Sequence, residues 1–244
     1  PSNLFSVSGE EVLNTNLFGK EISNPIGLAA GFDKSAEVYN SLFKLGYGFV
    51  EIGTVTPKRQ LGNPKPRVFR LEKDLALINR LGFNNHGSEI VSQRIASNSP
   101  NGFLGINIGP NKDTKSKEDD YYLCLSRLSS YAGYITINIS SPNTEGLRDF
   151  HDQKELEKLL HGLNKVRKNK NILKPLVLKL SPDINDTEIS KIIELTLKYK
   201  IQGLIISNTT DNNRENLFDT QKNEKGGLSG KPLKDLSTNL IKIY

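Results

Sequence analysis

The segment Tyr134-Ile-Thr-Ile-Asn138, followed at once by Ile139-Ser-Ser-Pro-Asn-Thr144, indicates the fold class most clearly. The first part is an apolar, β-branched run of the kind that forms a buried strand, and the second crowds hydroxyl, amide and proline side chains together. An Asx-type turn that closes a strand–helix loop is the plainer interpretation of the second part. Polar groups at the carboxyl end of a buried strand instead predict a site, because α/β folds place their sites at that edge.

Short apolar runs of this kind recur along the chain and alternate with helical patterns. Helices are indicated by apolar residues three or four positions apart, with Ser35 and Asp186 as expected caps of two of them. Strands that alternate with helices predict a parallel sheet, and strands that are apolar throughout predict that both faces of the sheet are covered. The strands are expected at residues 25–30, 48–52, 103–108, 134–138, 175–180 and 203–207.

The domain organisation follows from length and from two departures from this alternation. A chain of 244 residues with 36% hydrophobic content fits one α/β barrel better than two small domains, so residues 1–244 are predicted to form a single domain. A hairpin at about 11–24 is expected to close the floor of the barrel. An insert at about 56–85, with a strand pair around Arg67 to Arg70, and a polar loop at 211–225 are expected to act as covers.

Several function classes find no support in the sequence. The net charge is +6, but the basic residues are scattered and do not form the stripe, interleaved with aromatics, that nucleic-acid binding favours. The three histidines lie too far apart for metal-ligand spacing, so no metal site is predicted, and the one cysteine, Cys124, is expected to be a buried thiol. Gly226-Gly-Leu-Ser-Gly-Lys231 lacks the spacing of a phosphate-binding loop, and no apolar run is long enough for a membrane span.

The ends of the predicted strands carry polar residues in every case. In a parallel sheet the carboxyl ends meet at one edge, so these side chains are expected to lie close together. Small residues at 29–31 would let a flat ring approach the backbone, while lysines and amides would supply cations and fixed donors. This set predicts a flat anionic cofactor, a flavin rather than a nicotinamide. The strand-end residues are Lys34, Thr54, Asn107, Asn138, Lys179 and Ser207.

The ordered set of motifs resembles the signature segments of the dihydroorotate dehydrogenase family over nearly all of the chain from about Leu17. Each motif alone is weak, but the set, in order and with similar spacing, is specific. The segments are Gly27-Leu-Ala-Ala-Gly-Phe-Asp-Lys34, Glu51-Ile-Gly-Thr-Val-Thr-Pro57, Gly62-Asn-Pro-Lys-Pro-Arg67, Asn79-Arg-Leu-Gly-Phe-Asn84, Asn138-Ile-Ser-Ser-Pro-Asn-Thr144 and Gly226-Gly-Leu-Ser-Gly-Lys-Pro232.

This resemblance implies an FMN enzyme on a (β/α)8 TIM barrel that oxidises dihydroorotate to orotate in pyrimidine (UMP) synthesis. Ser141 would be the catalytic base, and a serine at this position is similar to the quinone-reducing, membrane-associated class. The soluble fumarate- or NAD-linked enzymes and the dihydropyrimidine dehydrogenase domain, which favour cysteine there, are the alternative enzymes. A non-catalytic barrel fragment is the alternative from outside enzymology.

The resemblance also implies roles for individual residues. Those implied to hold the flavin are Ala30, Gly31, Lys34, Thr54, Asn107, Asn138, Lys179, Ser207 and Gly230. Those implied to bind the substrate are Lys34, Asn79, Arg80, Leu81, Gly82, Phe83, Asn138, Asn143, Asn208 and Thr209.

Only about six βα units can be counted, so the C-terminal part of an eight-stranded barrel is expected to be missing from this chain. The quinone-reducing members also carry an amino-terminal helical pair that forms the membrane contact and the quinone entrance. That pair is not found in this sequence. Association with the bacterial or mitochondrial inner membrane is therefore expected to depend on a segment not present here.

Overall fold

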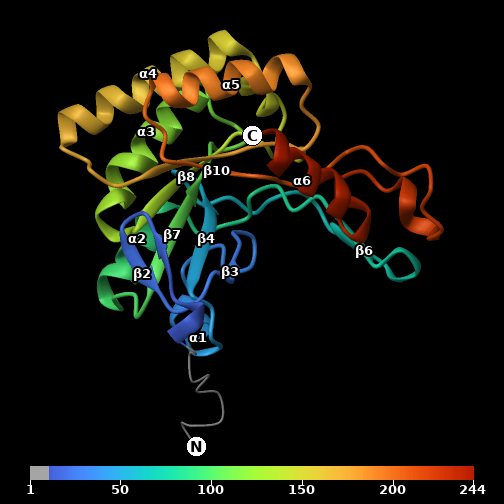
Figure 1. The fold of residues 1–244 in the computed structure, drawn as a ribbon, viewed down its shortest axis with the longest axis horizontal. Coiled ribbons are helices and arrows are strands. Elements are labelled where there is room, and N and C mark those ends of the chain that lie inside the picture. Colours follow the sequence, from blue (N-terminus) through green and yellow to red (C-terminus); the bar gives the residue numbers. More distant parts are fainter. Residues whose placement is uncertain (1–10) are drawn as a thin grey trace, which may run out of the picture.

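The computed structural model describes residues 11–244. At its centre lies a curled parallel sheet of six strands in the spatial order β10, β9, β8, β7, β4, β3 (Figure 1). Apart from an inserted strand pair, each strand lies beside the one that precedes it in the chain. The strands are β3 (Gly27–Leu28), β4 (Phe49–Val55), β7 (Phe103–Ile108), β8 (Tyr134–Asn138), β9 (Leu176–Lys179) and β10 (Gly203–Ile205).

Helices cover the outer face of this sheet and follow the strands in turn. In the helix Gln153–Lys170, a stripe of leucines three or four positions apart is fully buried at Leu156, Leu159, Leu160 and Leu163, whereas Leu123 and Leu197 of other helices face solvent. The second to fifth helices pack on one another in sequence order, and the first and third also pack on strands of the sheet. The helices are α1 (Tyr39–Lys44), α2 (Ser88–Ser97), α3 (Lys117–Leu128), α4 (Gln153–Lys170), α5 (Asp186–Lys198) and α6 (Lys231–Ile243).

Two of the predicted helix caps are wrong. Asn185, not Asp186, caps α5 and forms a capping box with Glu188. Ser35 caps no helix, because the carboxylate of Asp33 accepts hydrogen bonds from the backbone N–H groups of residues 35, 37 and 38 and holds them in an irregular loop. The helix α1 then begins only at Tyr39 and lacks a side-chain cap.

The amino-terminal hairpin lies beneath the sheet. Strands β1 (Thr15–Leu17) and β2 (Lys20–Ile22) pair in antiparallel fashion, within the segment where the sequence predicts a hairpin. At the turn, the ring of Phe18 lies 5.6 Å from the ring of Tyr134, and Tyr134 in turn lies 5.8 Å from Phe103. Three aromatic rings therefore lie near one another at the amino ends of β7 and β8.

A second, smaller sheet stands at the opposite edge. Its strands β5 (Val68–Leu71) and β6 (Ala76–Asn79) come from the predicted insert, and β11 (Gly227–Gly230) comes from a distant part of the chain. The three pair in antiparallel fashion in the order β11, β6, β5. They bury a small apolar cluster of their own, formed by Phe69, Leu71, Ile78, Leu217 and Leu228.

Six consecutive strand–helix units around a curled parallel sheet agree with the predicted (β/α)8 class, of which they form about three quarters. The predicted count of six βα units includes a helix between the second and third predicted strands, but the sequence pattern assigns no residues to it, and the structure places it at α2. Within residues 11–244, no helix combines the length and the apolar character needed to cross a lipid bilayer.

Candidate active site

A cavity of about 430 Å³ opens at the carboxyl ends of the parallel strands, which is within the usual size range of small-molecule sites. Its wall on one side is formed by the ends of five of the six parallel strands, all except β7, and on the other by the small antiparallel sheet. The residues that line it are Ala30, Gly31, Lys34, Thr54, Val68, Leu77, Asn79, Leu81, Gly82, Phe83, Asn138, Ser141, Asn143, Lys179, Ser207, Asn208, Thr209, Ser229 and Leu233.

The predicted site residues are brought together by the structure, with three exceptions. Asn107 lies beneath the cavity, fully buried behind Thr54 and Asn138. Arg80 turns away and pairs with Glu224 at 2.7 Å on the outside of the small sheet. Gly230 is next to the cavity residue Ser229 but does not line the cavity itself.

The floor of the cavity is a network of buried polar side chains centred on Glu51. Both carboxyl oxygens of Glu51, which is 3% exposed, accept hydrogen bonds: Asn107 Nδ2 donates at 2.9 Å and Thr136 Oγ1 at 2.7 Å. Asn107 Oδ1 then accepts from Thr54 Oγ1 at 2.7 Å and from Asn138 Nδ2 at 3.2 Å. The orientations of the two amides are therefore fixed before any ligand binds.

The strands β4 and β7 approach closely enough for this network to form because residue 53 of β4, which lies against β7, is a glycine. Gly53 has φ of +111°, and a Cβ atom there would lie 2.4 Å from the carbonyl oxygen of Asn107. No other residue type fits this position without moving the strand. The backbone N–H of Gly31 donates to Gly53 O at 2.9 Å, which ties the loop that carries Lys34 to the same strand.

Two lysines bring positive charge to the cavity. Burial, together with the charges of Lys179 and Arg67, lowers the pKa of Lys34 to about 8. Burial also lowers the pKa of Lys179, and the nearby carboxylate of Glu51 opposes this shift. A cation held in a water-poor cavity stabilises an anionic ligand much more strongly than the same cation in water.

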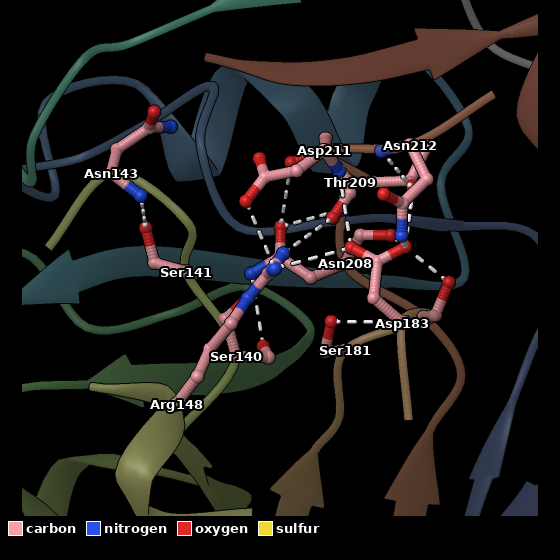
Figure 2. Close-up of polar contacts among 12 residues, drawn as sticks. Ser140, Ser141, Asn143, Arg148, Ser181, Asp183, Asn208, Thr209, Asp211 and Asn212 are labelled. Carbon is pink, nitrogen blue, oxygen red and sulfur yellow. Dashed lines mark hydrogen bonds and ion pairs between the residues drawn. The ribbon is translucent and has the colours of Figure 1, made fainter. Parts of the chain in front are cut away.

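Ser141 lies in the loop after β8 and is 5% exposed. Its Oγ accepts the backbone N–H of Asn143 at 3.2 Å, and the side chain of Asn143 donates to the carbonyl of Asn79 at 3.0 Å. The loop that carries the hydroxyl is thereby joined to the small sheet across the cavity. Figure 2 shows Ser141 and Asn143 beside the loop of Asn208 and Thr209.

A third group of polar residues follows β10. Asn208 Nδ2 donates to Ser140 Oγ at 2.9 Å, and the Asn208 Oδ1 atom accepts the N–H of Thr209 at 2.8 Å. Ser140 Oγ donates in turn to Asn138 Oδ1 at 3.0 Å. The amides of Asn138 and Asn208 are thus linked through one serine hydroxyl, which holds both at fixed positions along the cavity wall.

The loop at 211–225 lies over the small sheet and contains the short helix η5 (Thr220–Asn223). The N–H groups of Phe218 and Asp219 donate to the carboxylate of Asp74 at 2.9 and 3.0 Å. Arg214 donates to two carbonyls in the second half of the loop and to the carbonyl of Gly226, which follows it. The loop therefore has a defined structure, and its movement as a cover stays a prediction.

Sequence reasoning missed two sets of residues. The first comprises the cavity residues of the small sheet and α6, namely Val68, Leu77, Ser229 and Leu233. The second comprises the buried polar residues under the cavity, Glu51 and Thr136. A glutamate in the middle of the apolar run Phe49-Val-Glu-Ile52 was a visible signal, because a carboxylate is almost never fully buried without partners.

Comparisons with known proteins agree with this arrangement. A family model described as dihydroorotate dehydrogenase matches residues 12–244. Two curated relatives named dihydroorotate dehydrogenase (quinone) come from Christiangramia forsetii (48% identical, covering 95% of this chain and 68% of the relative) and Idiomarina loihiensis (44% identical, covering 100% of this chain and 74% of the relative). A third, from Bartonella tribocorum, is 48% identical over 94% of this chain and 65% of its own length, so the chain spans about two thirds of the relatives it matches.

Solved structures give the same result. A crystal structure of the Eimeria tenella enzyme in complex with ferulenol aligns with a TM-score of 0.90 and 40% identity, over 95% of this chain and 69% of that one. The ligand-free Eimeria tenella structure aligns equally well, with a TM-score of 0.90. The predicted family and fold class are both confirmed. The parallel sheet carries its polar residues at one edge, and the matches extend over almost the whole chain. This chain therefore belongs to the dihydroorotate dehydrogenase family.

Proposed function

We propose that this chain carries the cofactor and substrate site of a quinone-reducing dihydroorotate dehydrogenase, which oxidises dihydroorotate to orotate in de novo pyrimidine synthesis. The names of the relatives support the reaction and the quinone. The observation that carries the proposal is the single cavity shared by the hydroxyl of Ser141, the ammonium of Lys34 and the amides of Asn138, Asn143 and Asn208. Association with the bacterial or mitochondrial inner membrane belongs to the same proposal.

The family is flavin-dependent, and we infer that the flavin is FMN. Chemically, the cavity residues suit such a group. A Cβ atom at Gly31 would have no atom within 4 Å, so open space adjoins the backbone there, as the approach of a flat ring requires. A bound flavin would supply the acceptor for the hydride that leaves C6 of dihydroorotate. The residues proposed to hold it from the cavity wall are Ala30, Gly31, Lys34, Thr54, Asn138, Lys179 and Ser207. Two further residues proposed for this role lie outside the wall: Asn107 would act from beneath by orienting Thr54 and Asn138, and Gly230 lies beside the cavity residue Ser229.

The proposed mechanism assigns the removal of the C5 proton to Ser141. A serine hydroxyl is a weak base, so it can take the C5 proton only if its own proton passes to an acceptor or a water molecule behind it, and it requires a closed site. The near-complete burial of Ser141 supports the closed site, and the backbone N–H of Asn143, which donates to Ser141 Oγ, fixes the position of that oxygen. Covers from the insert and from residues 211–225 would exclude bulk water.

Binding of the substrate is assigned to groups that match its functional groups. The carboxylate of dihydroorotate would pair with Lys34, while the side-chain amides of Asn138, Asn143 and Asn208 would bind the polar edges of the ring. The remaining residues proposed to contact it are Asn79, Arg80, Leu81, Gly82, Phe83 and Thr209. Arg80 is the weakest member of this set, because its side chain already pairs with Glu224.

Replacing Lys34 by alanine is expected to weaken orotate binding and also to slow flavin reduction at saturating dihydroorotate. Because the pKa of Lys34 is lowered to about 8, the ammonium is present at pH 7 and is lost as the pH rises through about 8. Orotate affinity of the full-length flavoprotein should therefore fall above pH 8, by up to about tenfold per pH unit. Titration of the flavin absorbance with orotate at several pH values measures this.

The control for this prediction is Lys44→Ala, in the last turn of α1 and outside the cavity. It should leave orotate affinity and its pH profile unchanged. If Lys34 were instead a surface lysine outside the site, its replacement by alanine would change the orotate affinity and the reduction rate by less than about a factor of two, since surface changes rarely exceed about 0.5 kcal/mol. Equal affinity and an equal reduction rate in Lys34→Ala would remove Lys34 from the site.

The preferred electron acceptor distinguishes the quinone-reducing class from the soluble, fumarate- or NAD-linked class. With the full-length enzyme and dihydroorotate, we expect rapid turnover with ubiquinone-like quinones and little with fumarate or NAD, because position 141 is serine rather than cysteine. Steady-state assays with each acceptor at equal concentration measure the preference. Turnover with fumarate and none with quinone would move the protein to the soluble class, the second candidate.

A further inference from the structure

Arg148 connects two loops of the candidate site although it lines no part of the cavity. It belongs to the short helix η4 (Arg148–His151) after β8, and its side chain is 25% exposed. Its Nε donates to the carbonyl of Ser140 at 3.4 Å and its Nη2 to the carbonyl of Thr209 at 3.3 Å. Ser140 immediately precedes Ser141, and Thr209 immediately follows Asn208, so one guanidinium holds the backbone beside both groups (Figure 2).

Asp183 fixes the position of this guanidinium. It lies in the loop after β9, its side chain is 8% exposed, and it pairs with Arg148 Nη1 at 3.1 Å. The same carboxylate accepts the N–H of Asp211 at 3.0 Å, Asn212 Nδ2 at 3.1 Å and the hydroxyl of Thr210. Asp183 is thus the acceptor for three successive residues of the loop after β10, as Figure 2 shows.

The two loops that Arg148 joins do not belong to neighbouring strands. The strand β9 lies between β8 and β10, so the sheet ladder alone does not fix the distance between the loop of Ser141 and the loop of Asn208. Arg148 and Asp183 together form a clamp that contacts the three successive loops after β8, β9 and β10. A planar guanidinium with several fixed N–H groups can bind two carbonyls and two carboxylates at once, which a lysine ammonium cannot do with the same directions.

The loop after β10 is also held against the small sheet. Thr210 and Leu228 exchange two backbone hydrogen bonds, of 3.1 and 2.7 Å. A Cβ atom at Gly227 would lie 1.8 Å from Thr209 Oγ1, so the two segments are in close contact there. Together with the hydrogen bond from Asn208 Nδ2 to Ser140 Oγ, the clamp therefore fixes the approach of this loop toward Ser141.

The two ion pairs of Arg148 differ in burial. Breaking the pair with Asp183, whose side chain is 8% exposed, would destabilise the fold, whereas the pair with Asp211 at 3.0 Å, whose carboxylate is about half exposed, contributes little to the free energy of unfolding. The effect of positioning on the reaction rate can be large, because a displacement of about 1 Å between a catalytic group and its substrate can slow a reaction by about 10²-fold.

We propose that Arg148, oriented by Asp183, is a positioning residue for the dehydrogenation. It sets the distance between the Ser141 hydroxyl and the substrate held by Asn208 and Thr209. This inference rests on the proposed function and deepens it. Arg148 does not touch the substrate. It acts through the two carbonyls to which it donates.

The test is Arg148→Lys in the full-length flavoprotein. This variant keeps the positive charge but loses the planar set of N–H donors. Flavin reduction by dihydroorotate, followed by stopped flow, should slow by about 10- to 100-fold. The dissociation constant of orotate, measured by calorimetry, should change by less than about threefold. Deuterium at C5 of dihydroorotate should slow the variant more than the wild type, because a displaced base makes proton removal more limiting.

Two further variants separate positioning from general damage. Adding Arg148→Lys to Ser141→Ala should cause little further loss, because residues that act as a unit are non-additive. Asp183→Asn, which keeps the size and an acceptor oxygen, should slow reduction in the same direction and serves as the second probe if Arg148→Lys folds poorly. The matched control is Arg127→Lys on α3, whose guanidinium donates to Ser88 Oγ at 2.7 Å away from the cavity, and it should reduce flavin at the wild-type rate.

The inference is overturned if Arg148→Lys and Asp183→Asn both reduce flavin within twofold of the wild type. It is also overturned if Arg148→Lys slows the Ser141→Ala enzyme by the same factor as it slows the wild type, since the two effects would then be independent. Failure of the proposed function would look different: the wild-type flavoprotein itself would not be reduced by dihydroorotate.

Discussion

Ser141→Ala is expected to slow flavin reduction by dihydroorotate by about 10²- to 10⁴-fold in the full-length enzyme, the usual contribution of a positioned proton-transfer group. The flavin should remain bound, because Ser141 is not among the residues proposed to hold it and the amides beneath it are fixed by Glu51 and Thr54. Stopped-flow absorbance under anaerobic conditions measures the rate, and the absorbance spectrum measures the bound flavin.

Two companion variants define the expected pattern. Ser141→Cys should retain more activity than the alanine variant at high pH, because a thiol ionises more readily than a hydroxyl. Ser92→Ala, which removes an exposed hydroxyl that donates to a carbonyl within α2, should reduce flavin at the wild-type rate. A Ser141→Ala enzyme with near-normal reduction would show that another group removes the C5 proton.

Glu51→Leu is expected to destabilise the full-length protein by about 2–6 kcal/mol. The change would leave the side-chain donors of Asn107 and Thr136 buried without an acceptor, at about 1–3 kcal/mol each. It would also remove the negative charge that opposes the lowered pKa of Lys179. Urea unfolding, monitored by circular dichroism, measures the change in the free energy of unfolding.

The same variant should also disturb the site, because the amides of Asn107 and Asn138 lose the group that orients them. Glu51→Gln, which keeps one acceptor oxygen, should be less harmful than the leucine variant in both stability and flavin content. Glu157→Leu replaces an exposed carboxylate on α4 and should leave the unfolding midpoint unchanged. Wild-type stability in Glu51→Leu would mean that the buried network contributes nothing to the fold.

The strands of the barrel could be predicted where the apolar runs are continuous. At 103–108 and 134–138, both faces of the strand are buried, so the sequence itself marks the ends of the strand. The first strand was predicted at 25–30 but forms only at Gly27–Leu28. The side chain of Asn24 accepts the N–H of Ile26 at 2.9 Å, and the backbone at Gly31 turns toward Gly53, so both ends leave the ladder.

The sequence pattern assigns no residues to the helix α2 because its apolar stripe is short. Only Val91 and Ile95 are buried hydrophobics within Ser88–Ser97, and the remaining positions are mostly polar. The helix begins after Gly87 without a side-chain cap, so the usual start signal is also absent. Its position is set by tertiary contacts, including packing against α3, which a local pattern does not report.

The candidate site was predictable in part for a geometric reason. Parallel strands place their carboxyl ends at one edge, so Lys34, Asn138, Lys179 and Ser207 could be grouped from their positions at the strand ends alone. The wall formed by the small sheet could not be predicted in this way. In that sheet Asn79 pairs with Gly227 and Ala76 with Gly230, across a separation in sequence that leaves no local signature.

The most direct test of the central claim is an anaerobic single-turnover experiment on the full-length flavoprotein, in which dihydroorotate is added in small excess and both flavin and orotate are measured. We predict that the oxidised flavin absorbance is lost and that one orotate forms for each flavin reduced. A flavin that stays oxidised in the presence of dihydroorotate, with no orotate formed, would contradict the assignment of this cavity as a dihydroorotate site.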